Sequence, residues 1–204
     1  MPDKNHLRER RTNHKRRINL FEPRLRILIV CEGEKTEPNY FRSFPIKKES
    51  VVDIRGIGSN TIRLVREAIK LNKENKYDQA WCVFDKDDFP IENFNLALQV
   101  AKENGIRIAY SNEAFELWYV LHYEYLNSGI TRQQYIAKLN RLLGKKYIKN
   151  DELIYDEIYN VQKDAIRNAE RLLMEYSTPN PACDKPSTTV HLLVQQLNRF
   201  FWDE

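Results

Sequence analysis

The stretch Arg26-Ile-Leu-Ile-Val-Cys-Glu-Gly-Glu-Lys35 decides how the rest of the sequence is interpreted. Its apolar part, Ile27 to Cys31, runs without interruption into Glu32 and Gly33. An apolar run rich in β-branched residues that ends at a turn signal is typical of a strand buried on both faces of a parallel sheet. Ligands bind at the carboxyl edge of such sheets, so Glu32 is a candidate functional residue. The alternative is a surface glutamate at the end of a strand.

A second apolar run, Gln79 to Phe84, also ends in carboxylates, in the sequence Asp85-Lys-Asp-Asp88. In extended backbone Asp85 and Asp87 project to the same side, and Asp88 to the other. If the two strands are neighbours, Asp85 and Asp87 can converge with Glu32. Such carboxylates repel one another unless a cation lies among them, and all-oxygen ligation suits Mg²⁺ or Mn²⁺. This pattern favours phosphoryl-transfer chemistry.

Strands and helices are expected to alternate along the first half of the chain. The apolar patterns predict four strands and three intervening helices, the strands at 26–31, 51–55, 79–84 and 106–110, and the helices at 37–44, 61–75 and 91–104. This order predicts an α/β fold with a parallel sheet of about four strands and helices on both faces. The chain then becomes helical, with helices expected at 115–126, 131–142, 156–176 and 187–201. We therefore expect one domain, 25–204, in which a helical part (113–204) packs on an α/β core (25–112).

Composition limits the class of protein. The 204 residues, 42% hydrophobic and 30% charged, suffice for one sizeable core. No apolar run approaches the roughly 18 residues of a membrane span, and the basic amino terminus lacks a signal-peptide segment. We expect a cytoplasmic protein with no membrane partner. The three cysteines have no metal-ligand spacing and indicate a reducing compartment without a disulfide framework.

Positive charge is concentrated at the amino terminus. Residues 1–18 carry seven basic and two acidic side chains, a charge of +5, so the rest of the chain contributes −1 to the total of +4. We interpret residues 1–24 as a flexible basic arm that binds nucleic acid through counterion release, and a solubilising tail is the alternative. The candidate contacts are Arg8, Arg10, Arg11, Lys15, Arg16 and Arg17.

The acidic strand ends resemble a known domain. Glu32-Gly33 and Asp85-Lys86-Asp87 resemble the TOPRIM domain of topoisomerases, primases, OLD-type nucleases and small ribonucleases. Three longer stretches resemble the RloB family: Cys31-Glu-Gly-Glu-Lys-Thr-Glu-Pro-Asn-Tyr-Phe41, Ser111-Asn-Glu-Ala-Phe-Glu-Leu-Trp118 and Lys185-Pro-Ser-Thr-Thr-Val190. This resemblance implies a TOPRIM-like bacterial protein of phage-defence gene clusters, similar to abortive-infection proteins and often found beside an AAA-type or ABC-type ATPase. One departure is Glu113, where members usually have proline, so the loop geometry is open and Glu113 is a further possible ligand.

The resemblance also implies roles for individual acidic residues. Glu32 matches the TOPRIM glutamate, a general acid/base or metal ligand, and Asp85 and Asp87 match the metal-binding pair. Glu37 and Glu116 match acidic positions of the RloB pattern, although a charge at a helix start explains Glu37 nearly as well.

Other polar residues have plainer interpretations beside the functional ones. Lys35 and Lys149 could stabilise negative charge in a transition state, but lysines are more often solvated surface residues. We interpret His122 and His191 as packing residues, and Ser187 and Thr188 as caps of the last helix. The aromatic cluster could stack on bases, yet core packing is the more common role, and its members are Phe115, Trp118, Tyr119, His122, Tyr123 and Tyr125.

The sequence thus predicts a Mg²⁺-dependent nuclease of the TOPRIM type that acts as a toxic effector in bacterial antiphage defence. RNA such as tRNA is favoured over DNA as the substrate. The alternative is a non-catalytic partner that binds nucleic acid or docks an ATPase. The oligomeric state and the trigger are left open.

Overall fold

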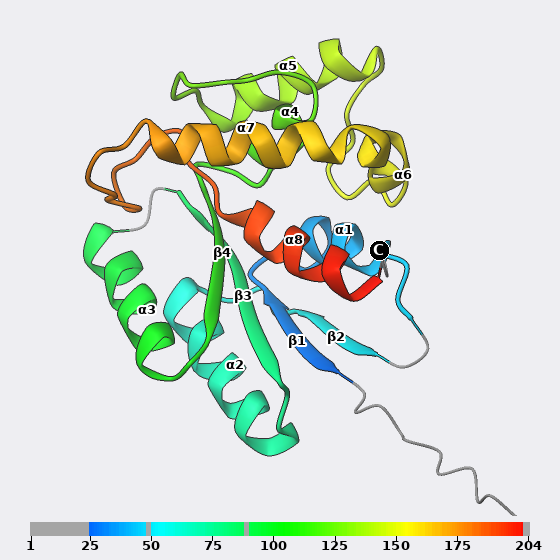
Figure 1. The fold of residues 1–204 in the computed structure, drawn as a ribbon. Helices are drawn as coiled ribbons and strands as arrows, with labels where there is room; N and C mark the ends of the chain where they lie inside the picture. The colour runs from blue at the N-terminus through cyan, green and yellow to red at the C-terminus, as the bar shows by residue number, and fades with distance from the viewer. Residues whose placement is uncertain (1–24, 48–49, 88–89, 202–204) are drawn as a thin grey trace, which may run out of the picture.

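A four-stranded parallel sheet forms the centre of the molecule in the computed structural model, which describes residues 25–47, 50–87 and 90–201. The strands are β1 (Arg26–Cys31), β2 (Val51–Gly56), β3 (Gln79–Lys86) and β4 (Arg107–Asn112), in the order β2-β1-β3-β4. All three pairings are parallel, as Figure 1 shows. The α/β fold class predicted from the apolar runs is confirmed. The first and third strands are neighbours, which is the condition under which Glu32 and Asp85 can come together.

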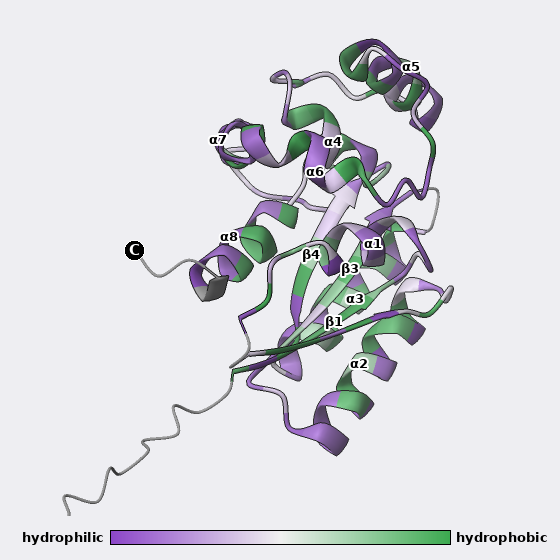
Figure 2. Cartoon of the chain, turned by 90° about the vertical axis from the view of Figure 1, so that its right-hand side faces the viewer, coloured by the Kyte–Doolittle hydropathy of each residue, from purple (hydrophilic) through white to green (hydrophobic). Residues whose placement is uncertain are grey.

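Helices cover both faces of the sheet because the two middle strands are apolar on both sides. Along β1, Leu28 and Val30 belong to one core, and Ile27 and Ile29 to the other. The first core is closed by α2 (Thr61–Asn75) and α3 (Ile91–Glu103). In Figure 2 the middle of the sheet is hydrophobic, whereas α2 carries both hydrophobic and hydrophilic residues.

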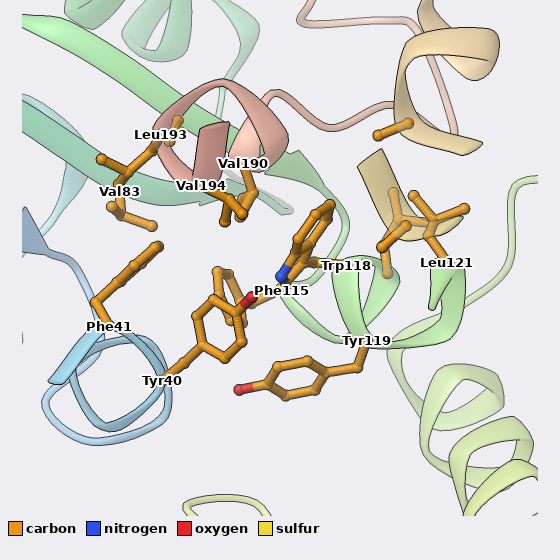
Figure 3. Packing of buried hydrophobic residues seen from close by; sticks show 14 of the residues in the cluster. Tyr40, Phe41, Val83, Phe115, Trp118, Tyr119, Leu121, Val190, Leu193 and Val194 are labelled. Carbon is orange, nitrogen blue, oxygen red and sulfur yellow. The ribbon is translucent and has the colours of Figure 1, made fainter. Parts of the chain in front are cut away.

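The opposite core joins the sheet to the helical part of the chain. Its helices are α1 (Thr36–Arg42), α4 (Glu116–Leu121), α5 (Arg132–Leu143), α6 (Ile154–Ile158), the 3₁₀ turn η1 (Tyr159–Val161), α7 (Gln162–Met174) and α8 (Val190–Phe201). In Figure 3, Tyr40 of α1 faces Phe115 and Trp118, and Phe41 lies beside Val83, with Val190 and Val194 of α8 on the other side of this cluster. The predicted packing role of the aromatic cluster is confirmed for its buried members, Phe115, Trp118, Tyr119 and His122, while Tyr123 is exposed.

Three helix predictions in this part were wrong at their boundaries. The helix expected at 115–126 ends at Leu121, and the one expected at 156–176 is divided into α6, η1 and α7. The last helix begins at Val190 because the preceding segment forms β-type pairs with β4: Asn112 N–H donates to Ser187 O (2.8 Å) and Thr189 N–H to Tyr110 O (2.8 Å). This segment adds antiparallel pairing at the β4 edge through a bridge between Ser111 and Thr188.

None of the helices in the described ranges has the length and apolar character needed to cross a membrane. The six basic arm residues proposed to contact nucleic acid, and Asp88, lie outside the described residues.

Candidate functional site

The carboxyl ends of β1 and β3 bring Glu32 and Asp85 into contact. The two strands are paired with Cys31 opposite Val83, and the Glu32 N–H donates to Val83 O (2.8 Å). The Asp85 N–H in turn donates to Glu32 Oε2 (3.2 Å). At the other carboxylate oxygen, Thr61 Oγ1 donates to Glu32 Oε1 (3.4 Å) from the first turn of α2. The Glu32 carboxylate is therefore oriented by two strands and a helix.

Glu37 reaches the same edge from α1. Its side chain is 8% exposed, and Oε2 is buried without a hydrogen-bond partner. This oxygen faces the turn after β1, because a Cβ placed on Gly33 would lie 2.1 Å from it. The glycine of the Glu-Gly pair is thus needed for a close approach between the turn and a buried carboxylate.

Glu116 is the most buried member of the acidic group, 2% exposed at the start of α4. Tyr147, which follows α5, donates its hydroxyl to Glu116 Oε1 (3.3 Å). Asp85, Glu37 and Glu116 influence one another electrostatically, although they come from a strand end and two helices. The candidate carboxylates, which are far apart in the sequence, therefore lie close enough for their charges to affect one another.

The pKa values of Glu32, Asp85 and Glu37 are raised above those of ordinary carboxyl groups. Burial raises the pKa of Glu32 to about 7, against the lowering effect of the Asp85 N–H bond, and the charge of Asp87 raises it further. Burial, followed by the charges of Glu37 and Glu116, raises the pKa of Asp85 well above its ordinary value. Burial also raises the pKa of Glu37, opposed in part by Lys149. Burial is thus the main cause of the raised pKa values, and pKa values perturbed in this way are typical of functional carboxylates.

Arg132, like Thr61 and Tyr147, is a residue of this site that sequence analysis missed. It is the first residue of α5, and its Nη2 lies 3.6 Å from Asp85 Oδ2 and 3.9 Å from Asp87 Oδ2. The capping box of Thr131 and Gln134 could be recognised in the sequence as a helix start. Nothing in the sequence indicates that this helix start faces β3, because the loop that leads to it has no periodic pattern.

Glu113 has a different role from the one considered for it. Its carboxylate pairs with Lys185 and accepts the Arg132 backbone N–H at Oε1 (3.2 Å). Burial opposes ionisation, but the Lys185 contact outweighs it and lowers the pKa of Glu113. Its φ of 74° is one that proline cannot adopt, so this loop differs from that of a relative with proline at this position.

The lysines differ in their relation to the site. Lys149 is exposed, and its charge acts on Glu37. The loop that carries it is attached to α1, since Asn150 Oδ1 accepts from Thr36 Oγ1 (2.9 Å) and Asn150 O from Asn39 Nδ2 (3.4 Å). Lys35 is exposed at the position before α1.

The remaining polar candidates belong to the packing of the helical part. His122 is 2% exposed, its Nδ1 lies 2.8 Å from Trp118 O, and burial lowers its pKa to about 4. His191 is also 2% exposed. Thr188 Oγ1 accepts the N–H of Val190 (3.3 Å), the first residue of α8, as a helix cap does. Ser187 instead donates its hydroxyl to Asp184 O (2.7 Å), so of the two residues only Thr188 has the predicted capping role.

The acidic group has the donor chemistry for a hard divalent cation. All its donors are carboxylate oxygens, the pKa values of Glu32, Asp85 and Glu37 are raised, and one buried oxygen of Glu37 has no partner. In the described part of the chain, no three His, Cys, Asp or Glu side chains are positioned together as ligands of one ion. The ligand types therefore fit such an ion, and ligation would require side-chain rotation.

The fold and the site define an α/β protein with an acidic group at the carboxyl edge of a parallel sheet. Within this class the chain belongs to the RloB family: the family model described as RloB-like protein matches residues 27–197. The match spans the sheet, the acidic group and most of α8. Neither a curated protein nor a solved structure matched the chain.

Proposed function

We propose that this protein is a Mg²⁺-dependent nuclease of the TOPRIM type. The observation that carries the proposal is the joining of Glu32 and Asp85 at one sheet edge, with Glu37 and Glu116 close enough to raise the pKa of Asp85. Burial and mutual repulsion raise the pKa values of these carboxyl groups and make their ionisation unfavourable. Such a cluster is expected of a functional site, because a protein that serves only as a scaffold gains nothing from it.

Glu32, Asp85 and Asp87 would hold the cation, with Mn²⁺ as an alternative to Mg²⁺. When bound, the ion would neutralise the scissile phosphate and lower the pKa of an attacking water. Glu32 has a pKa of about 7, so its carboxyl can accept or donate a proton near neutral pH. The N–H of Asp85 and the hydroxyl of Thr61 hold that carboxyl in one orientation. Lys149 would add positive charge on the Glu37 side.

The wider role rests on the family and on the charge of the chain. The RloB resemblance implies a toxic effector of bacterial antiphage defence, active on RNA such as tRNA in preference to DNA. The basic arm would hold the nucleic acid by contacts to its phosphates. An AAA-type or ABC-type ATPase would be the partner that keeps the nuclease silent before infection.

The first experiment is calorimetric titration of the whole chain with Mg²⁺ and Mn²⁺, because it requires no knowledge of the substrate. Wild type is compared with Glu32→Gln and with the double variant Asp85→Asn/Asp87→Asn. We expect binding to wild type and its loss in the double variant. Cleavage of tRNA, single-stranded RNA and DNA, with and without the metal, is then measured for the same proteins.

Equal heats in all three proteins would mean that these carboxylates hold no metal by themselves. If cleavage were absent as well, the nuclease proposal would give way to a non-catalytic nucleic-acid-binding or ATPase-docking partner.

A further inference from the structure

Arg132 lies where a cation would be expected. Its guanidinium is beside both carboxylates of the Asp85 and Asp87 pair, and its charge lowers the pKa of Asp85 against the burial and the repulsion that raise it. The side chain of Asp85 is 17% exposed and that of Arg132 is 42% exposed. The pair is therefore accessible from solvent on the arginine side.

The position of Arg132 does not depend on the two aspartates. Its backbone N–H donates to Glu113 Oε1 (3.2 Å) and its Nη2 donates to Glu113 O (3.1 Å). Glu113 is itself anchored by Lys185 and by its N–H, which donates to Lys86 O (2.7 Å). Arg132 thus stays at the edge even when Asp85 and Asp87 bind something else.

We propose that Arg132 is a switching cation: it pairs with Asp85 and Asp87 in the metal-free chain, and turns to a phosphate group of the substrate when a divalent ion takes these carboxylates. This inference rests on the metal site of the proposed function. The guanidinium has several N–H donors in a planar fork that suits phosphate oxygens, and one of its nitrogens is already held by a backbone carbonyl. Glu113 and Lys185 are positioning residues for it.

Competition with the ion gives the first test. Mn²⁺ binding to the whole chain is measured by calorimetry for wild type, Arg132→Gln, Arg132→Lys and Arg141→Gln. Arg141 is the matched control, because it lies on the same helix and pairs with Glu124 instead. We expect Arg132→Gln to bind Mn²⁺ roughly fivefold more tightly, the effect of removing two partly exposed ion pairs. Arg132→Lys, which keeps the charge, and Arg141→Gln should stay near wild type.

Phosphate binding gives the second test, with inorganic phosphate as the probe. We expect phosphate to raise the unfolding temperature of the wild type more with Mg²⁺ present than without it. This Mg²⁺-dependent increment should disappear in Arg132→Gln and persist in Arg141→Gln. A purely structural role for Arg132 would weaken Mn²⁺ binding together with stability, which is opposite to the expected gain in affinity.

The outcomes separate this inference from the proposed function. Unchanged or weaker Mn²⁺ binding in Arg132→Gln, with binding lost in Asp85→Asn/Asp87→Asn, overturns the switching role and leaves the metal site intact. A phosphate increment that is absent from wild type, or equal in wild type and Arg132→Gln, also overturns it. Absence of Mn²⁺ binding from wild type and Arg132→Gln alike overturns the switching role, and the cleavage assay then decides the nuclease proposal by itself.

Discussion

The backbone N–H of Asp85 donates to Oε2 of Glu32 across a sequence separation of 53 residues. The contact exists because β1 and β3 are neighbours and their apolar runs end within one residue of each other at this edge of the sheet. It stabilises the ionised form of Glu32, yet burial prevails and the pKa of this carboxyl rises to about 7. Ionisation of Glu32 near neutral pH therefore costs folding free energy in the metal-free chain.

This cost predicts a pH dependence of stability. In the unfolded chain a glutamate titrates near pH 4.3, so the folded state binds the extra proton between that value and about 7. The stabilising contribution of Glu32 to the free energy of unfolding is therefore fully present below pH 4 and is lost as the pH rises through 7. We expect the stability of wild type relative to Glu32→Gln to fall by about 1–2 kcal/mol between pH 5 and pH 8, allowing for solvent screening of this partly exposed group.

Urea unfolding of the metal-free proteins at pH 5 and pH 8 measures this difference. Glu92→Gln, at an exposed position of α3, is the control and should follow wild type at both values. A pH-independent difference between wild type and Glu32→Gln would contradict the raised pKa.

Gly33 should be required by the site more than by the fold. A Cβ at this position would lie 2.1 Å from Glu37 Oε2, a side-chain end that can move. We expect Gly33→Ala to fold, to displace the Glu37 carboxylate, and to weaken Mn²⁺ binding at the proposed site about tenfold. The reason is that Glu37 lies beside the proposed ligands, and changes around the ligands of an ion typically cost about tenfold or more in affinity. Calorimetry and circular dichroism check these two expectations.

Gly56→Ala is the matched comparison, since the added Cβ would meet backbone, 2.5 Å from Gly33 O and 2.7 Å from Glu34 Cα. Backbone cannot yield as a side chain does, so this variant should lose about 1–3 kcal/mol of stability. If Gly33→Ala destabilised the chain as much as Gly56→Ala while leaving Mn²⁺ binding intact, the glycine would serve the fold alone.

Adjacent leucines of α8 test how the last helix is held. Leu193 is 0% exposed in the core beside β4, whereas Leu192 is 44% exposed. We expect Leu193→Ala to lower the free energy of unfolding by about 2–4 kcal/mol through lost burial and the cavity left behind. Leu192→Ala should cost less than about 1 kcal/mol. Denaturant titrations measure both, and similar losses would mean that α8 does not pack on the sheet as described.

The sequence carried enough information for the sheet and for part of the site. Continuous apolar runs that end in carboxylates predict both the middle strands and the convergence of Glu32 with Asp85, because both follow from one local pattern and the geometry of a parallel sheet. Residues 187–189 look like a helix start, and their pairing with β4 depends on a partner strand about 78 residues earlier in the chain. Arg132 begins α5 after a loop that has no periodic pattern, so its position beside Asp85 depends on contacts between distant parts of the chain.

Glu113 occupies a position at which the RloB pattern usually has proline, so the loop around it is where this chain departs from the pattern. Proline would be incompatible with the φ of 74° and would remove the N–H that donates to Lys86 O (2.7 Å). We expect Glu113→Pro to lose at least about 2 kcal/mol of stability, from backbone strain together with an unsatisfied carbonyl. Glu113→Gln keeps the backbone and loses only the partly exposed pair with Lys185, at a cost of about 0.5–1 kcal/mol. Thermal and urea unfolding rank the two variants. Equal stability of Glu113→Pro and wild type would mean that the loop can adopt a second geometry, in which Arg132 loses its contact with Glu113 O.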